Sequence, residues 1–206
     1  QTAKEQGKLA ELGIEGSGDL DRQVLEKMLP PFEHMLRNAV IHGMESPAER
    51  QILGKPAAGA IRIVIRREGA EVVIEIADDG RGLDIAAIRR KAVDLGFVGS
   101  DTPLTDDEAM QFILRSGFST ADQLTQAAGR GIGMDVVANQ VAKLGGTLSI
   151  ASRRGLGTTF IVRLPFTLAV TQALIVRTGT ELYALPLPTV EGIIRIGRRE
   201  FEERMQ

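Results

Sequence analysis

The stretch HMLRNAVIHG, residues His34–Gly43, carries two patterns at helical spacing. Its apolar residues can form one buried stripe along a helix. His34, Asn38 and His42 recur every four residues and therefore share a different face of the same helix. An amide side chain thus lies in line with two imidazoles, and the role of this polar line depends on the motifs around it.

The helix that holds this line is predicted to run over Asp19–Met44, with Asp19 as its N-cap. Pro30 and Pro31 both lack an N–H group and clash with the preceding turn, so we expect a kink or a break with a restart at this pair. The run GKLAELGIEG before the helix, residues 7–16, alternates weakly and predicts a short strand.

Two hairpins are predicted from alternating apolar and polar residues. The first joins IRIVIRR (61–67) to EVVIEIADDG (71–80) through a Glu-Gly-Ala turn. The second joins TLSIAS (147–152) to TTFIVRLP (158–165) through a turn that contains glycine.

Three helices are predicted between the two hairpins, at residues 84–95, 105–114 and 131–144. Thr105 and Glu108 have the spacing of a capping box. The polar segment Ser116–Gly131 shows little periodicity and predicts a long loop, and such loops are usually functional or mobile.

This order of elements predicts an α+β fold, in which helices cover one face of a mixed, largely antiparallel sheet. After Pro165 the sequence changes to three β-type runs divided by Thr-Gly-Thr and by prolines. We therefore expect one domain over residues 1–165 and a second over residues 166–206. The second is too short for more than part of a small β-barrel, which should be marginally stable alone.

Composition narrows the functional classes. The net charge is -2 with acids and bases interleaved, and aromatic residues make up only 4%, so no nucleic-acid partner is expected. The absence of cysteine excludes disulfides, thiolate metal sites and cysteine nucleophiles. No apolar run approaches the roughly 20 residues that span a bilayer, so we expect no membrane insertion and a cytoplasmic location.

The motif DDGRGLD, residues 78–84, ends the second strand of the first hairpin. It delivers Asp78 to the end of a strand, where Gly80 and Gly82 allow the backbone to bend closely around a ligand. A carboxylate fixed there can accept a hydrogen bond from an exocyclic amine. The alternative is a plain surface turn, because Asp-Gly is among the commonest turn dipeptides.

The motif AAGRGIGMDVV, residues 127–137, places Gly129, Gly131 and Gly133 directly before a helix. Free N–H groups and the positive end of a helix dipole converge there, so an oligophosphate would bind well, with Arg130 as its charge partner. The motif is not a dinucleotide-binding fingerprint, since no strand precedes it, and not a Walker loop, since no Gly-Lys-Ser/Thr follows.

Together with GLGTTF, residues 155–160, these motifs occur in the order of the four-box nucleotide site of the GHKL ATPases and kinases, which have the Bergerat fold. A closer resemblance is to the catalytic domain of the CheA-like chemotaxis histidine kinases, and it covers essentially the whole chain. The motifs that carry it are HMLRNAVIHGMESPAERQILGKP (34–56), DDGRGLD, GFSTADQ (117–123), GRGIGMDVV (129–137) and LPFTLAV (164–170).

The residues after Pro165 resemble the first strands of the CheW-like regulatory domain, an SH3-like barrel. A bare C-terminal β-extension is the alternative. Because the remaining barrel strands are absent, this segment is not expected to bind an adaptor by itself.

The resemblance implies ATP and Mg²⁺ as ligands of the site. Asn38 would bind Mg²⁺ through its side-chain carbonyl and His34 would face the γ-phosphate, so these are the expected catalytic residues. Asp78 would bind the adenine amine in a pocket shaped by Gly80 and Gly82. Other nucleotide-binding residues are expected at His42, Lys91, Gly129, Arg130, Gly131, Gly133, Met134, Thr158 and Thr159, and lid residues at Phe118, Ser119 and Thr120.

Three positions near the expected nucleotide have a second interpretation. His42 lies at the far end of the polar line and also fits a purely structural role. Lys55 and Lys91 match family positions near the phosphates, but each could equally solvate a loop.

The hydrolysing members of the superfamily place a Glu one helical turn before the Asn, where it can activate water. This chain has His34 there, and Glu33 is rotated by about 100° around the helix. The resemblance therefore implies a protein histidine kinase. An ATP-driven conformational switch or ATPase without phosphotransfer is the alternative.

The phosphate acceptor is expected outside this chain, because its only two histidines both lie in the nucleotide-site helix. The implied partners are a histidine phosphotransfer domain, in the same parent protein or in trans, and a downstream response regulator. A CheW-like adaptor and a chemoreceptor would bind through the full regulatory domain. The parent is expected to be a homodimer and this chain alone a monomer.

Overall fold

The computed structural model describes residues 2–18, 20–118, 133–166 and 173–186, together with Gly192 and Gly197. The chain divides into two compact units, Gln1–Leu168 and Ala169–Gln206. Several predicted residues lie outside the described set: Asp19, Ser119, Thr120, Gly129, Arg130 and Gly131.

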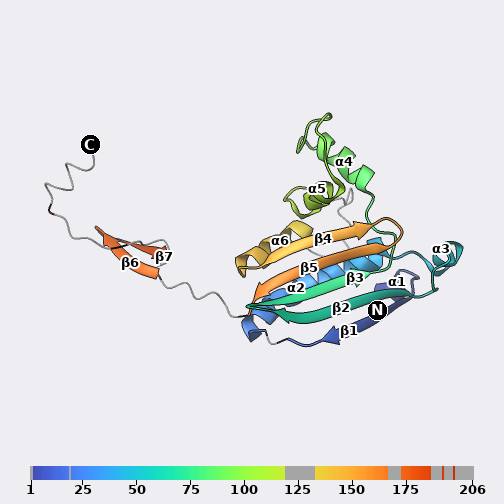
Figure 1. The fold of residues 1–206 in the computed structure, drawn as a ribbon, viewed down its shortest axis with the longest axis horizontal. Coiled ribbons are helices and arrows are strands. Elements are labelled where there is room, and N and C mark those ends of the chain that lie inside the picture. The colour runs from blue at the N-terminus through green and yellow to red at the C-terminus, as the bar shows by residue number, and fades with distance from the viewer. Residues whose placement is uncertain are drawn as a thin grey trace. The chain divides into compact units, whose positions relative to one another are not determined.

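The first unit is built on a five-stranded sheet with the strand order β1-β2-β3-β5-β4 (Figure 1). β1 pairs with β2 in parallel, and the other neighbouring pairs are antiparallel. Ile76 of β3 faces Ile63 of β2 and Phe160 of β5, so apolar positions of three strands fall on one face. The strands are β1 Ala10–Gly16, β2 Gly59–Glu68, β3 Glu71–Asp78, β4 Thr147–Arg153 and β5 Gly157–Pro165.

Two helices cover this face, α2 (Arg22–Asn38) and α6 (Met134–Lys143). Figure 1 shows α2 running along the strands on this side. The main core joins both helices to three strands through Val24, Met28, Met35, Val137, Val141, Ile74, Ile76, Ile150, Val162 and Leu164. The predicted α+β fold, a largely antiparallel sheet with helices on one face, is confirmed.

The shorter elements of the first unit are α1 Thr2–Glu5, the π-helix η1 Ala39–Gly43, α3 Pro47–Ile52, α4 Ile85–Asp94, α5 Asp106–Gln111 and the 3₁₀-helix η2 Phe112–Leu114. The capping box of α5 is confirmed, because Thr105 Oγ1 accepts from Glu108 N at 3.2 Å and Glu108 Oε2 accepts from Thr105 N at 2.8 Å. α4, α5 and η2 share a second apolar cluster that contains Ile88, Ala92, Ala109, Phe112 and Phe118.

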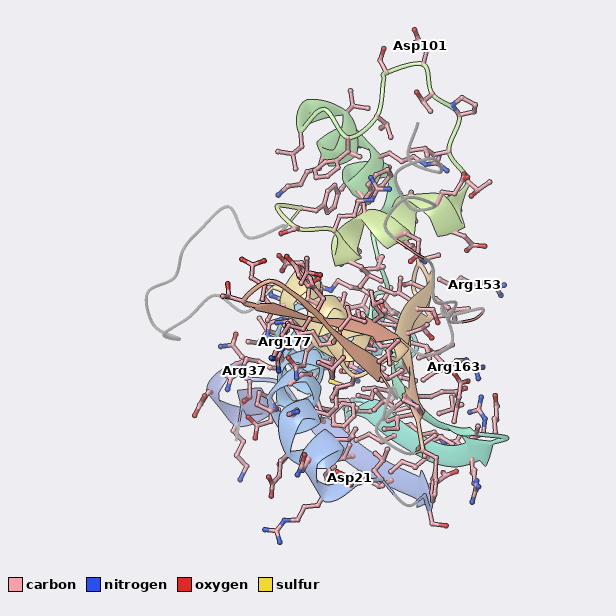
Figure 2. The ribbon with its side chains drawn as sticks, turned by 90° about the vertical axis from the view of Figure 1, so that its left-hand side faces the viewer. Asp21, Arg37, Asp101, Arg153, Arg163 and Arg177 are labelled. Atoms are coloured by element: carbon pink, nitrogen blue, oxygen red, sulfur yellow. The ribbon has the colours of Figure 1, made fainter. Side chains whose placement is uncertain are left out.

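The predicted start of α2 is wrong. The helix begins at Arg22, and its N-cap is Asp21, whose side chain accepts a hydrogen bond from Gln23 N at 2.7 Å. Figure 2 shows Asp21 at this end of the helix and Arg37 toward the other end. The start at Arg22 puts Val24 into the core on the first turn of the helix.

Of the two outcomes predicted at Pro30 and Pro31, the break with a restart is wrong, because α2 continues through both residues. The kink stays a prediction. The prolines remove the hydrogen bonds to the carbonyls of Glu26 and Lys27. Both of these residues are exposed, so water can satisfy the carbonyls without a break in the helix.

The described part of the second unit is one antiparallel hairpin, β6 (Ala173–Thr178) and β7 (Glu181–Pro186). Gly179 occupies its turn with a φ of 63°. The third β-type run lies outside the described residues, and the CheW-like barrel stays a prediction. Across the described parts of both units, no helix is both long enough and apolar enough to cross a lipid bilayer.

Candidate functional site

Asp78 is the last residue of β3, the central strand of the sheet. The residue is only 9% exposed, and its Oδ1 accepts a hydrogen bond from Gly80 N at 3.0 Å. Burial raises the pKa of Asp78, while the backbone N–H groups of Gly80 and Thr158 act in the opposite direction. A buried carboxylate whose pKa stays raised gains stability from each further hydrogen-bond donor that reaches it.

Backbone from three segments lies close around Asp78, because glycines stand where side chains would collide. A Cβ on Gly43 would lie 3.1 Å from Asp78 Oδ1, and one on Gly80 would lie 2.2 Å from Gly43 O. A Cβ on Gly157 would lie 1.8 Å from Asp78 O, at a φ of +102°. The N–H of Arg81 also donates to Gly43 O at 2.8 Å, which joins the end of η1 to the turn after β3.

Gly43 and Gly157 were missed as site residues, although both belong to motifs noted in the sequence. Their roles depend on contacts with Asp78 that sequence spacing does not reveal. The predicted Gly82 adopts a φ of +70°, and a Cβ there would lie 2.5 Å from Arg153 O. Gly82 therefore packs the turn after β3 against the end of β4, where Figure 2 shows Arg153.

Asn38 is the last residue of α2, and two hydrogen bonds at its amide nitrogen hold its side chain in place. Nδ2 lies 3.0 Å from His34 Nε2 and donates to Met134 Sδ at 3.5 Å. Burial is the main cause that lowers the pKa of His34, so the imidazole is neutral near pH 7 and its Nε2 can accept. Both hydrogen bonds of Asn38 to described residues thus use the nitrogen, which leaves the side-chain oxygen for a hard cation.

The start of α6 lies beside Asn38, since Met134 is its first residue. Gly133 is the N-cap, and no described side chain caps the first turn of this helix of 10 residues. Asp135 Oδ2 instead accepts a hydrogen bond from Ser116 Oγ at 3.2 Å. The N–H groups of the first turn and the helix dipole therefore favour an anion at this end.

The polar line of His34, Asn38 and His42 does not continue on one α-helix, because residues 39–43 form a π-helix. The wider turn changes the angular position of His42 relative to Asn38. Lys8 Nζ donates to Val40 O at 2.9 Å and to Ile41 O at 2.7 Å. Burial and then the charge of Lys8 lower the pKa of His42.

Of the two threonines predicted near the adenine, Thr158 is the one whose backbone N–H acts to lower the pKa of Asp78. Thr158 is 6% exposed, and its Oγ1 lies 3.1 Å from Ser152 Oγ. Ser152 Oγ accepts from Leu83 N at 2.9 Å, so the hydroxyl pair also fixes the turn after β3. Thr159 points to the opposite face of β5, since side chains alternate along a strand.

The described contacts of Lys55 are with the protein, and its contact with ATP stays a prediction. Its Nζ donates to Glu45 Oε1, Asp79 O and Gly80 O, each at 2.8 Å. These contacts use all three donors of the ammonium group, so Lys55 fixes the backbone of the turn after β3. Lys91 is partly buried on α4.

Phe118, predicted as part of a lid, is fully buried in the second apolar cluster, which α4, α5 and η2 share. Its ring centroid lies 5.8 Å from those of Phe97 and Phe112. The aromatic packing anchors the chain where the expected lid begins.

A family model for "Histidine kinase-, DNA gyrase B-, and HSP90-like ATPase" matches residues 29–168. The chain belongs to this ATPase family. The matched range includes every segment that contributes to the described site, from the end of α2 to the start of β5. Membership of this ATPase family supports ATP as the nucleotide.

Curated relatives of this ATPase-family chain include two bacterial proteins. It is 43% identical over 190 residues to a chemotaxis protein CheA of Treponema pallidum, an alignment covering 92% of this chain and 23% of that protein. It is 42% identical over 199 residues to a gliding motility regulatory protein of Myxococcus xanthus, covering 95% of this chain and 26% of that protein. The chain thus spans about a quarter of the length of these relatives.

Proposed function

We propose that this chain is the ATP-binding catalytic domain of a chemotaxis-type histidine kinase, which transfers the γ-phosphate of ATP to a histidine on a separate phosphotransfer domain. The observation that carries the proposal is the 3.0 Å contact between His34 Nε2 and Asn38 Nδ2. A neutral imidazole that accepts from the amide occupies the place where a hydrolase of this family needs a carboxylate base. Glu33, the nearest acid on the helix, is exposed.

The donor set fits ATP with a divalent cation. Asp78 would accept a hydrogen bond from the adenine amine, and the uncapped start of α6 would face the phosphates. Asn38 would offer its side-chain oxygen to Mg²⁺, because its nitrogen is already bonded to His34 and Met134. A bound Mg²⁺ would offset the charge of the phosphates.

The remaining site residues belong to the same proposal. Gly129, Arg130 and Gly131 would extend the phosphate contacts of Gly133, and Lys91 would contact the nucleotide from α4. His42 fits a structural role better, because it lies in the π-helix η1 and not in the α-helix that carries His34 and Asn38.

The partners follow from the chemistry of a kinase whose acceptor lies elsewhere. A histidine phosphotransfer domain would receive the phosphate and pass it to a response regulator, and a parent homodimer would bring donor and acceptor together. A CheW-like adaptor and a chemoreceptor would control the kinase through the full regulatory domain. Because the cytoplasm supplies ATP, we place the protein there.

Incubation of the chain with Mg²⁺, γ-labelled ATP and an isolated histidine phosphotransfer domain tests the proposal. We expect acid-labile phosphate on that domain and slow release of inorganic phosphate from the chain alone. The controls are a phosphotransfer domain whose histidine is replaced by Gln and the Asp78→Asn chain. Rapid phosphate release with an unlabelled acceptor would instead support an ATPase, and tight ATP binding without either reaction would support a conformational switch.

A further inference from the structure

A network of two cations and two carboxylates, two of them buried and two partly exposed, contacts the turn that follows Asp78. Arg50 of α3 is its centre and is 0% exposed. The other members are Glu45, which is 3% exposed, Lys55 and Asp79. An arginine is fully buried only where its N–H groups find hydrogen-bond partners. The partners of Arg50 therefore show which segments it holds in place.

The guanidinium of Arg50 holds three segments of the chain together. Nε donates to Pro56 O at 2.7 Å, and Nη1 donates to Glu45 Oε2 at 3.0 Å. Nη2 donates to Asp79 Oδ2 at 2.7 Å, with a longer contact of 3.4 Å from Nη1 to Asp79 O. This planar fork fixes the position of Asp79 in a way that a single ammonium group cannot reproduce.

The network determines where the backbone of residues 79 and 80 lies. Lys55 binds the carbonyls of both residues, and Asp79 Oδ1 accepts from Ala60 N of β2 at 2.9 Å. The N–H of Gly80 then donates to Asp78 Oδ1. Arg50 is therefore linked to the Asp78 carboxylate through its hydrogen bond to Asp79, the peptide bond to Gly80 and the hydrogen bond from Gly80 N.

The charges of the network also act on Asp78. Glu45 and Asp79 both disfavour the ionised form of Asp78, in addition to burial. Arg50 and Lys55 balance these two acids, so loss of either cation would leave unpaired negative charge close to the carboxylate.

We propose that Arg50 is a positioning residue for base recognition: through Asp79 and Gly80 it holds the Asp78 carboxylate in the orientation that accepts the exocyclic amine of adenine. This inference rests on the proposed function, because it requires adenine at Asp78. It gives α3 control over which base the site accepts, although α3 is not among the elements proposed to contact the nucleotide.

The test compares ATP with inosine triphosphate, which carries an oxygen in place of the exocyclic amine. Both affinities are measured by calorimetry with Mg²⁺ for the unmodified chain, for Arg50→Lys and for Asp79→Asn. We expect Arg50→Lys to weaken ATP binding about tenfold and to leave inosine triphosphate binding nearly unchanged. Asp79→Asn weakens the bond by which Arg50 fixes residue 79, so it should move the ratio in the same direction even though it also removes a charge that disfavours ionised Asp78. It keeps Arg50 in place if Arg50→Lys does not fold.

Arg22→Lys is the matched control, because Arg22 forms a salt bridge with Glu26 while its side chain is 90% exposed. It should change neither affinity. A purely structural role of Arg50 would lower both affinities equally or lower only the melting temperature, and either result overturns the inference. If the unmodified chain does not distinguish the two nucleotides, the proposed adenine contact fails first, so the two failures are separable.

Discussion

Asp78 combines two properties that rarely occur together in one residue: it is nearly buried, and it is expected to act as a carboxylate. Burial raises its pKa, and two backbone N–H groups compensate only in part. Without a nucleotide this ionised group disfavours the folded state. The same group supplies a charge-assisted hydrogen bond when an amine reaches it.

Asp78→Asn separates these two effects. The neutral amide removes a buried charge, so the melting temperature without nucleotide should stay level or rise. ATP binding should weaken by about 1.5–3 kcal/mol, as for a lost hydrogen bond to a charged group. Thermal melts with and without Mg²⁺ and ATP measure both quantities, and an undiminished ATP-induced shift in the variant would exclude the adenine contact.

The raised pKa of Asp78 also predicts a dependence on pH. Between the ordinary value of 3.8 and the raised value, the folded chain binds a proton that the unfolded chain lacks. The contribution of this group to the free energy of unfolding therefore falls as the pH rises through that window. ATP affinity should change in the opposite sense and weaken as acidification protonates the carboxylate.

The measurement is the ratio of ATP affinities of the unmodified chain and Asp78→Asn at several acid pH values. Taking the ratio cancels the titration of the phosphates themselves. A ratio that stays constant down to pH 4 would show that this carboxylate does not contribute.

Gly157 and Gly155 form a matched pair for testing the close backbone approach at Asp78. Both have positive φ, of +102° and +80°, but a Cβ on Gly155 meets nothing within 4 Å whereas one on Gly157 meets Asp78 O. Gly155→Ala should lower the free energy of unfolding by about 1–2 kcal/mol through backbone strain alone. Gly157→Ala should lower it clearly further and weaken ATP binding. Urea unfolding of both variants checks this, and equal losses would contradict the packing argument.

At the scale of single elements, the sequence predicted what depends on neighbours in the chain. The capping box of α5 needs only Thr105 and Glu108, so its prediction is confirmed. Asp19 and Asp21 are equally good caps locally, and the packing of Val24 against the sheet decides between them. The glycine contacts around Asp78 likewise join distant segments, which residue types alone could not indicate.

The π-helix η1 could not be predicted for the same reason. Its carbonyls at Val40 and Ile41 are bonded to Lys8, which lies more than 30 residues earlier in the chain. No local pattern within residues 39–43 signals a partner at that distance. Tertiary contact therefore selects the wider turn.

Lys8→Met should destabilise η1, because both carbonyls lose a partly buried donor. We expect a loss of about 1–3 kcal/mol in the free energy of unfolding and faster amide exchange in residues 40–44. Lys4→Met is the control, since Lys4 is exposed on α1. Hydrogen exchange measured by mass spectrometry resolves the segment, and unchanged exchange there would show that η1 does not depend on Lys8.

At the scale of the whole molecule, the described residues of the proposed nucleotide site lie within one unit. The end of α2, the turn after β3, the start of α6 and the start of β5 all belong to Gln1–Leu168. The core that orders these segments belongs to the same unit. The order of the motifs along the chain predicted this assembly, although it gave no contacts between them.

A chain ended after Leu168 should therefore keep its ATP affinity within about twofold, a difference of about 0.4 kcal/mol. Calorimetry on the full chain and on residues 1–168 makes the comparison. A large loss of affinity in a shortened chain that still unfolds cooperatively would show that the second unit completes the site.

The hydrogen bond from the N–H of Arg81 to Gly43 O joins the two ends of the site. One end holds the carboxylate and the other leads back through η1 to Asn38. Under the proposed function, the base would contact the segment that carries Asp78 and the phosphates would contact the segment that carries Asn38. This hydrogen bond would couple the two segments, so each part of the nucleotide would favour the binding of the other. Cooperativity of this kind would favour the complete nucleotide over its pieces without any additional contact to the protein.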